Sequence, residues 1–302
     1  MQGGTGDDPA FVAVTDLAVL RGEGVFETMR VYGGRPFRLT EHLDRLARSA
    51  AAVDVELGGF DLVKLAEEAA EGADGQDAVL RVVCTKGPDA SGGGGLLRDA
   101  SVGAKPQGAA YGLCTTVPDE LEAERSAGLR LVLLTLAVDP LVRAASPWLL
   151  PAVKSTAYAV NMAAQRWARS AGADEAVFTG LGGELLETPT ANVWWRAGEV
   201  LHTPSLATGI LPGVTRLVVT ELAPGLGYRV VDGVYGFEDL RTADEVFLTS
   251  SVREVMPVVA VAPEPSVPAA HLRPVGDGRP GPAATALQAG LRRSAYAAGG
   301  RA

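Results

Sequence analysis

The segment between residues 25 and 50 carries an alternating strand pattern, a glycine turn and an amphipathic helix in direct succession. Residues 25–32 (V-F-E-T-M-R-V-Y) alternate apolar and polar side chains, which is typical of a β-strand. Gly33-Gly34 follows as a hairpin turn before Pro36-Phe37. Thr40 is then a suitable N-cap for a helix whose apolar residues recur at helical spacing as far as Ala50. The segment therefore predicts the beginning of an α/β fold.

The remaining patterns divide the chain into two domains, a division that its length of 302 residues suits. Further strand and helix patterns occupy residues 62–70, 78–85, 110–117, 129–138, 155–169 and 214–222. Residues 120–128 are polar and end in glycine, which predicts a linker. The apolar run 129–138 after it predicts a strand that is buried on both faces. We therefore predict an α/β (α+β) chain with a small α/β domain at residues 1–118 and a larger domain at 119–302.

The charge and composition exclude several classes of function. The net charge is −9, and the longest basic cluster, Arg292-Arg293, is too small to neutralise a nucleic-acid backbone. No two of the three histidines share a ligand-like spacing, so we expect no metal site. The apolar runs are too short to cross a bilayer, and the N-terminus lacks a signal-peptide pattern. Cys84 and Cys114 are interpreted as buried thiols of a reducing cytosol, and we expect a cytoplasmic protein.

Lys154 and Glu187 are candidate reactive groups. Lys154 follows the apolar residues 148–153, and desolvation there would make its amine a nucleophile able to form a Schiff base. The alternative is a surface lysine whose stem lies along apolar groups. Glu187 follows a hairpin strand, where its carboxylate could keep a pyridinium nitrogen protonated. The alternative is an exposed glutamate at the end of a strand.

Two further segments are candidates for binding an anion. Residues 209–216 (G-I-L-P-G-V-T-R) form a Gly/Pro turn that places backbone N–H groups and the Thr215 hydroxyl at a helix N-terminus, where a phosphate is favoured. The alternative is an ordinary turn between a strand and a helix. Arg45 lies near the start of a helix, where it could donate charge-assisted hydrogen bonds to a phosphate. The alternative is a solvated arginine paired with Asp44 or Glu41.

Together, five ordered segments resemble the class-IV aminotransferase family, the fold type IV group of pyridoxal-phosphate (PLP) enzymes. The segments are R-G-E-G-V-F-E-T-M-R-V-Y-G-G-R-P-F-R-L-T-E-H-L-D-R-L, K-S-T-A-Y, E-L-L-E-T-P-T-A-N-V-W-W, L-H-T-P-S-L-A-T-G-I-L-P-G-V-T-R and D-E-V-F-L-T-S-S-V-R-E-V-M-P-V. The resemblance covers most of the chain, from near residue 12 to near residue 260. It implies a small α/β domain and a larger barrel-like domain, PLP as the cofactor, a small-molecule amino substrate and a homodimer.

The resemblance also implies roles for individual residues. Lys154 corresponds to the lysine that forms the Schiff base with PLP and moves the substrate proton. Glu187 corresponds to the partner of the pyridine nitrogen, and Tyr158 to the residue that hydrogen-bonds the phenolic oxygen of the cofactor. Leu211 corresponds to a residue that packs against the cofactor ring. The resemblance implies a phosphate site made of Arg45, Val214, Thr215 and Ser251.

The family includes branched-chain aminotransferases, D-amino-acid or R-amine transaminases and 4-amino-4-deoxychorismate lyases. Thr28 stands where branched-chain enzymes commonly have glycine and D-amino-acid enzymes have an apolar residue. Its hydroxyl could relay the proton that elimination needs, and the alternative is a threonine chosen for β-propensity. We therefore expect a lyase of the folate pathway that forms 4-aminobenzoate and pyruvate. A D-amino-acid transaminase and then a branched-chain aminotransferase are the alternatives.

The substrate contacts are less well defined by the sequence. Arg30, Arg98 and Arg143 are candidates for binding a substrate carboxylate. Ala157 stands where many lyases have asparagine, and the stretch K-S-T-A-Y-A-V-N-M departs from each subgroup, which puts the subgroup in doubt. A remote alternative is a non-catalytic, cofactor-binding interaction protein. The joint presence of the lysine, tyrosine, glutamate, arginine and threonine named above argues against it.

Overall fold

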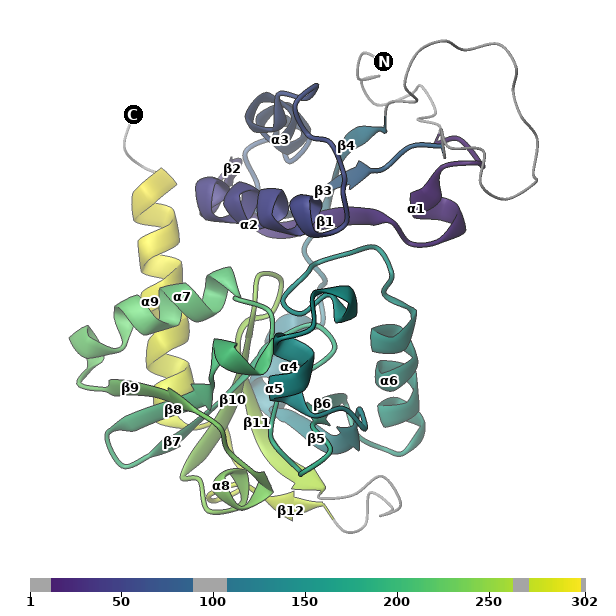
Figure 1. Cartoon of the computed structure of the whole chain (residues 1–302). Coiled ribbons are helices and arrows are strands. Elements are labelled where there is room, and N and C mark those ends of the chain that lie inside the picture. Colours follow the sequence, from purple (N-terminus) through teal and green to yellow (C-terminus); the bar gives the residue numbers. More distant parts are fainter. Residues whose placement is uncertain (1–11, 89–107, 263–271, 300–302) are drawn as a thin grey trace, which may run out of the picture. The chain divides into compact units, whose positions relative to one another are not determined.

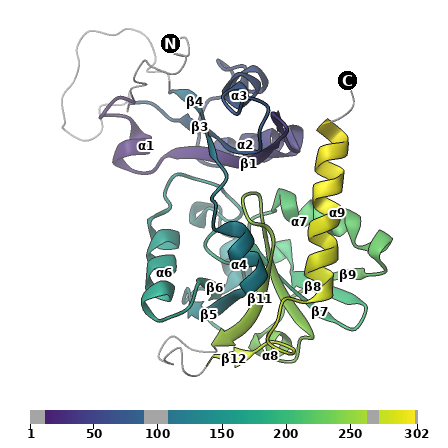
Figure 2. The same cartoon turned by 180° about the vertical axis from the view of Figure 1, so that it is seen from behind.

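The computed structural model describes residues 12–88, 108–262 and 272–299, which are drawn in colour in Figures 1 and 2. These residues form two compact units. The first is built from the chain up to Thr116 together with Val153–Tyr158, and the second from Val117–Ala152 and the chain from Ala159 onward. The segment that contains Lys154 thus belongs with the N-terminal part of the chain. The domain limits at residues 118 and 119 stay a prediction.

The first unit is an antiparallel sheet that two helices cover on one face. Its elements are α1 (Leu17–Leu20), β1 (Gly24–Tyr32), β2 (Arg35–Pro36), α2 (Leu39–Ala52), α3 (Leu62–Glu71), β3 (Ala78–Thr85) and β4 (Ala110–Thr116). Within the described residues the sheet has four strands in the order β2-β1-β3-β4. Side chains alternate along β1, so Val25 and Met29 join the apolar core with residues of α2 and α3. Phe26 and Thr28 therefore lie on the opposite face of the sheet.

The second unit is a mixed sheet with helices on its faces. Its helices are α4 (Leu121–Ala127), α5 (Pro140–Ala144), α6 (Ala159–Ser170), α7 (Val214–Leu222), α8 (Phe237–Arg241) and α9 (Pro282–Gly299), with short 3₁₀ turns η1 (Pro147–Leu149), η2 (Leu206–Thr208) and η3 (Pro224–Leu226). Its strands are β5 (Leu129–Thr135), β6 (Glu175–Thr179), β7 (Asn192–Ala197), β8 (Val200–Pro204), β9 (Arg229–Gly233), β10 (Glu245–Ser250), β11 (Glu254–Ala262) and β12 (Arg273–Pro274). In the described part of the chain the strand order is β6-β5-β11-β10-β7-β8-β9, with β12 on β11.

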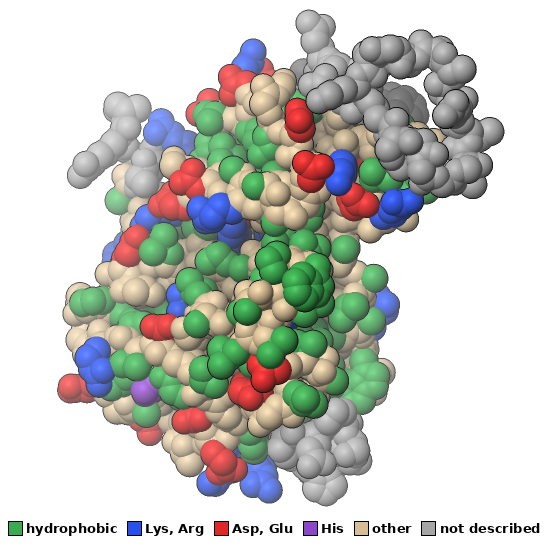
Figure 3. Space-filling view, in the orientation of Figure 1, with side chains coloured by type: hydrophobic (Ala, Val, Ile, Leu, Met, Phe, Trp, Pro, Cys, Tyr) green, Lys and Arg blue, Asp and Glu red, His purple; other side chains and the backbone are tan. Residues whose placement is uncertain are grey.

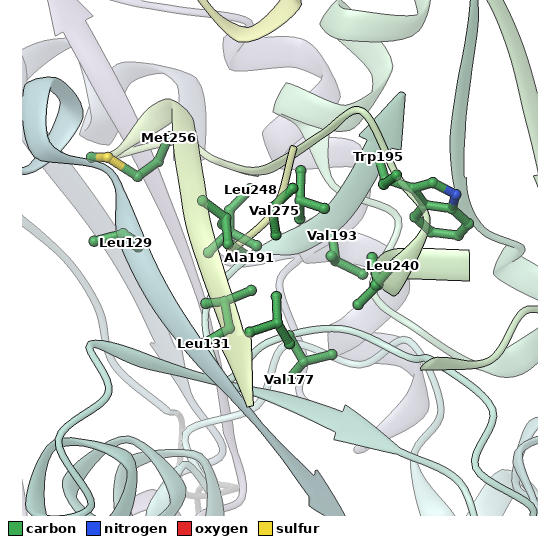
Figure 4. Packing of buried hydrophobic residues seen from close by; sticks show 14 of the residues in the cluster. Leu129, Leu131, Val177, Ala191, Val193, Trp195, Leu240, Leu248, Met256 and Val275 are labelled. Atoms are coloured by element: carbon green, nitrogen blue, oxygen red, sulfur yellow. The ribbon is translucent and has the colours of Figure 1, made fainter. Parts of the chain in front are cut away.

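The core of the second unit lies on the central strands of this sheet. Leu131 of β5, Val193 of β7 and Leu248 of β10 are fully buried in one apolar cluster, which Figure 4 shows from close by. The helix α9 packs along β11 and against α7 (Figures 1 and 2). None of the helices in the described ranges is long and apolar enough to span a membrane.

Two local predictions are wrong. The helix α2 begins at Leu39, and its N-cap is Arg38 in the left-handed conformation (φ 56°), so Thr40 lies inside the helix. After β2 and Phe37, the chain turns through this left-handed residue, which starts the helix earlier than a threonine cap would. Most of the predicted linker at residues 120–128 is the helix α4. Its first residue, Leu121, is buried in the apolar cluster of the second unit, and this tertiary contact outweighs the polar composition.

Candidate active site

Lys154 lies on an extended segment that pairs with the first strand of the sheet. The Phe26 N–H donates to the Lys154 carbonyl (3.1 Å), and the Thr156 N–H donates to the Gly24 carbonyl (2.8 Å). The helix predicted to begin at Ser155 begins later, as α6, so this part of the prediction is wrong. The reason is that the backbone groups of this segment are hydrogen-bonded to β1 and are not available for a helix. The pairing fixes the backbone of Lys154 against the sheet.

The amine of Lys154 lies among aromatic rings. Its Nζ is 4.3 Å from the centroid of the Phe26 ring and 5.6 Å from the centroid of the Tyr158 ring. The two rings meet edge to face, with 5.3 Å between their centroids. The backbone N–H of Lys154 donates to Ser49 Oγ at 3.1 Å. Aromatic faces attract a cation while they limit its hydration, so this setting orients the amine. The structure thus brings Lys154 and Tyr158 together in the first unit.

On the helix-covered face of β1, a buried glutamate holds Arg45. Arg45 donates from Nε and Nη2 to the two carboxylate oxygens of Glu27 at 2.7 Å each, and the His42 ring nitrogen Nδ1 contacts the same carboxylate at 2.7 Å. Burial alone would raise the pKa of Glu27, but the hydrogen bonds and charges of Arg45 and His42 lower it to about 2. Arg45 is buried, so the alternative of a solvated arginine paired with Asp44 or Glu41 is wrong. Its contact with a phosphate stays a prediction.

Glu27→Gln should destabilise the fold by about 3 kcal/mol at neutral pH, because the pKa of Glu27 is lowered from 4.5 to about 2. A carboxylate with a lowered pKa stabilises the folded state fully above pH 4.5 and loses this effect as the pH falls toward about 2. Denaturant titrations should therefore give a larger difference between wild type and variant above about pH 5 than at lower pH. The difference should decrease below pH 4.5. A difference that does not change with pH would contradict this role of the ion pair.

The opposite face of β1 carries Thr28 next to a cation that the sequence analysis missed. Thr28 is the direct cross-strand partner of Arg81 of β3, and the Arg81 guanidinium is 5.2 Å from the centroid of the Phe26 ring. Thr28 Oγ1 is buried, and it has no hydrogen-bond partner within the described residues. The signal for Arg81 was its position as the one charged residue of the strand A-V-L-R-V-V-C-T. Since the Lys154 amine lies over the same ring, this face combines an amine, a hydroxyl and a guanidinium.

Two of the three arginines predicted to bind a substrate carboxylate lie within the described residues, and their contacts differ. Arg30 is 5% exposed, its Nη2 is 3.8 Å from Asp77 Oδ2, and its guanidinium is 5.3 Å from the centroid of a tyrosine ring. Arg143, in the last turn of α5, donates from Nη1 to the Gly209 carbonyl at 3.3 Å. Arg98 lies outside the described residues. The substrate role of all three stays a prediction.

In the second unit, the Glu187 carboxylate is held by the turn that precedes α7. The Leu211 N–H is 3.1 Å from each carboxylate oxygen of Glu187, and the Asn192 side-chain amide donates to Oε2 at 3.4 Å and to the Leu211 carbonyl at 2.9 Å. A Cβ at Gly213 would lie 2.0 Å from Asn192 Oδ1, so only glycine allows this close approach. Glu187 is half-buried, and the alternative of an exposed glutamate is wrong. Asn192 was missed, although it ends the segment E-L-L-E-T-P-T-A-N.

The same turn leads into a helix N-terminus that could bind an anion. The N-cap of α7 is Gly213, which has no side chain that could hydrogen-bond to the first turn of the helix. Val214 and Thr215, which open the helix, are buried. The N–H groups and the dipole of a helix N-terminus favour an anion. Ser251 lies in the turn that follows β10. Anion binding by Val214, Thr215 and Ser251 stays a prediction.

Each unit thus carries distinct chemical groups. The first has an amine between aromatic rings, and the second has a carboxylate fixed by a backbone N–H and a helix start suited to an anion. A cofactor with an aldehyde, a basic ring nitrogen and a phosphate requires groups of these three kinds, so the residues present fit PLP. Among the residues that the structure describes, no cluster of three or more His, Cys, Asp or Glu could hold a metal ion.

Comparison with known sequences identifies the same family as the five sequence segments. The family described as amino-transferase class IV matches residues 24–261. A putative branched-chain-amino-acid aminotransferase of Methanocaldococcus jannaschii is 34% identical over 83% of both chains. An aminodeoxychorismate lyase of Bacillus subtilis is 30% identical, covering 83% of this chain and 82% of its own. A D-alanine aminotransferase of Bacillus licheniformis is 29% identical, covering 94% and 91%.

Solved structures agree with the sequence comparison. The fold IV transaminase CpuTA1 of Curtobacterium pusillum matches with a TM-score of 0.78 and 30% identity, covering 97% of this chain and 90% of its own. A hypothetical aminotransferase from Mycobacterium tuberculosis in its PLP-bound form matches with a TM-score of 0.78 and 26% identity, covering 96% of both chains. The predicted α/β fold class and the resemblance stated from the five segments are confirmed.

Proposed function

We propose that this chain, which belongs to the class-IV aminotransferase family and is a PLP-dependent enzyme, is a 4-amino-4-deoxychorismate lyase. The proposed reaction removes the proton from the ring carbon that bears the amino group. It then breaks the C–O bond to the enolpyruvyl group and releases 4-aminobenzoate and pyruvate, without a second substrate. The named relatives differ in reaction, so the proposal rests on the residues of the candidate site.

The proposed cofactor contacts follow from the groups of each unit. PLP, when bound, supplies an electron-withdrawing ring that stabilises negative charge at the substrate α-carbon. Lys154 would hold the cofactor aldehyde covalently, and its amine would remove the substrate proton when it is free. The Glu187 carboxylate, already oriented by the Leu211 N–H, would keep the ring nitrogen protonated. The further proposed contacts are Tyr158 and Leu211 to the ring, and Arg45, Val214, Thr215 and Ser251 to the phosphate.

The buried hydroxyl of Thr28 is the observation that favours elimination. A buried hydroxyl without a hydrogen-bond partner is costly, which suggests that a ligand completes it. Thr28 lies beside Phe26 on the sheet face over which the Lys154 amine is held. A hydroxyl there can pass a proton to the departing enolpyruvyl group, and Arg81 opposite can bind a substrate carboxylate. Transamination does not need this hydroxyl, because a lysine amine alone can move its proton.

Thr28→Val should slow release of pyruvate by about 10- to 100-fold, because the variant keeps the shape of the side chain and loses the proton donor. Exchange of the substrate α-proton with solvent should change much less, since Lys154 carries out that step. Deuterium washout and pyruvate release, measured on the same samples, separate the two effects. Thr115→Val, in β4 of the same sheet, is the matched control and should leave both rates unchanged. Equal slowing of both steps by Thr28→Val would contradict the proton-relay role.

A product assay tests the proposed reaction itself. With 4-amino-4-deoxychorismate alone, the enzyme should form 4-aminobenzoate and pyruvate in equal amounts. A D-amino-acid transaminase is the second candidate, which the similarity to a D-alanine aminotransferase supports. Ping-pong kinetics with D-alanine and 2-oxoglutarate, with no release of 4-aminobenzoate, would overturn the lyase and leave the cofactor assignment in place.

We also propose that the chain works as a homodimer on a small-molecule amino substrate. Exposed apolar side chains of α5 and of the nearby turn η1 in the second unit support a second copy as partner: Trp148 is 78% exposed, Val142 60% and Leu141 55%. Figure 3 shows hydrophobic side chains gathered on the face in view. Single exposed apolar residues are common on monomers, but contiguous patches usually mark interfaces. The cytoplasmic location stays a prediction from the sequence.

A further inference from the structure

The turn between β10 and β11, residues 250–254, ends in a residue with an unusual backbone conformation and a buried charge. Glu254 has φ 58°, a left-handed conformation that costs free energy for any residue with a side chain. Its carboxylate is also buried, at 1% exposure. A left-handed residue often ends a short hairpin loop, where glycine is favoured, but the loop does not require a buried carboxylate at that residue. The turn carries Ser251, which is proposed above to contact the cofactor phosphate.

Three side chains from two helices bind the Glu254 carboxylate. Arg125 of α4 donates to it at 3.0 Å, and Gln288 of α9 donates at 2.6 Å. Arg292, one turn further along α9, donates from Nη2 at 2.8 Å. Hydrogen bonds between a carboxylate and arginines are strong. A buried charge that lost its partner would cost free energy, so the three side chains must keep this geometry. The position of Glu254 is therefore closely defined by α4 and α9.

Two of these side chains also hold the backbone on either side of Glu254. Arg125 Nη1 donates to the carbonyl of Arg253 at 3.1 Å and to the carbonyl of Val255 at 3.2 Å. The Gln288 side-chain oxygen accepts from the Val255 N–H at 2.9 Å. These contacts fix the direction of the chain as it leaves the turn, rather than only the position of one side chain.

The residue before Glu254, Arg253, has the opposite charge and forms a separate ion pair. Arg253 donates from Nη1 to the fully buried Glu175 of β6 at 2.8 Å. The Arg253 N–H also donates to Ser250 Oγ at 3.3 Å, which closes the turn. Arg253 Nε is also 3.9 Å from Glu124 Oε2 of α4, so Arg253 is bound to β6 and α4, and Glu254 to α4 and α9. The residues between β10 and β11 have little freedom to rearrange.

We propose that Glu254 is a positioning residue that holds the 250–254 turn so that Ser251 binds the phosphate of the cofactor. The inference rests on the proposed role of Ser251. A hydroxyl contributes to anion binding only if its loop is held in place before the ligand arrives, because ordering the loop on binding costs affinity. Glu254 supplies that rigidity without touching the cofactor.

The test compares binding of PLP with binding of pyridoxal, which lacks the phosphate, to the full-length protein freed of cofactor. Glu254→Gln keeps the shape of the side chain and removes the charge that binds both arginines. It should weaken PLP binding about tenfold, the size of one lost hydrogen bond to a charged group, and leave pyridoxal binding within about twofold. A merely structural role would weaken both ligands alike or neither.

Glu245→Gln is the matched control. Glu245 is buried, pairs with Arg196 and accepts from the Ala283 and Ala284 N–H groups, so it also ties α9 to the sheet. It lies at the other end of β10 from the turn. Glu245→Gln should lower the unfolding temperature without changing the ratio of PLP to pyridoxal affinity.

A second variant keeps the test valid if Glu254→Gln fails to fold. Arg125→Lys retains the positive charge, but its single nitrogen cannot replace both Nη1, which donates to the two carbonyls, and Nη2, which donates to Glu254. It should therefore also lower PLP affinity selectively. Ser251→Ala identifies the source of any failure. If Ser251→Ala weakens PLP binding while Glu254→Gln and Arg125→Lys do not, the positioning role is overturned. If Ser251→Ala has no effect on PLP binding, the proposed phosphate contact is itself wrong and the inference falls with it.

Discussion

Lys154→Ala should lower turnover by several orders of magnitude while PLP remains bound. The substitution removes both the proposed covalent attachment and the amine proposed to move the substrate proton. The Arg81 guanidinium, which lies near the same ring, cannot form a Schiff base in its place. The proposed phosphate contacts and the Glu187 carboxylate are not altered by the substitution, so the cofactor should still bind. Single-turnover kinetics and the absorbance of the bound cofactor measure the two quantities separately.

The control for this variant is Lys64→Ala. Lys64 is an exposed residue of α3 whose Nζ is 3.6 Å from Glu68 Oε1. It should leave turnover and cofactor content at the wild-type level. Turnover of Lys154→Ala within about tenfold of the wild type would contradict the assignment of Lys154, because loss of a covalent catalyst has a much larger effect.

Glu187→Gln should lower turnover by about 10²- to 10³-fold, the size typical of losing one preorganised electrostatic contact. Glutamine can still accept the Leu211 N–H, so the turn and the bound cofactor should be retained. It cannot balance the positive charge of a protonated ring nitrogen, and the cofactor would withdraw electrons less strongly. The exposed hairpin residue Glu199 provides the control, since Glu199→Gln should behave as wild type. Near-normal turnover of Glu187→Gln would show that the carboxylate has another role.

The parts of the fold that could be predicted from the sequence are those whose signals are local. The alternation at residues 25–32 and the Gly33-Gly34 turn predicted β1 and the hairpin to β2, because side-chain period and turn preference act over a few residues. The local sequence also predicts Lys154 and Glu187 as candidate reactive groups. Their specific roles follow only from the resemblance that the five segments carry together.

The details that the sequence did not reveal depend on contacts between distant segments. Residues 154–156 have a helical pattern downstream, yet they pair with β1, a strand from the beginning of the chain. Arg45 is hydrogen-bonded to Glu27 on that strand, whereas the local sequence indicates only Asp44 or Glu41 as ion-pair partners. Asn192 binds Glu187 because the absence of a side chain at Gly213 leaves room for its amide. Each of these contacts requires the folded sheet and cannot be inferred from residue spacing.

Borohydride reduction of the PLP-bound protein, followed by peptide mass mapping, tests the central claim that Lys154 holds the cofactor. Reduction makes the linkage between PLP and its lysine irreversible, so the modified peptide identifies the residue. We expect the visible absorbance of the cofactor to be bleached and the added mass to lie on the peptide that contains Lys154. An added mass on Lys86 or Lys105, with Lys154 unmodified, would contradict the account.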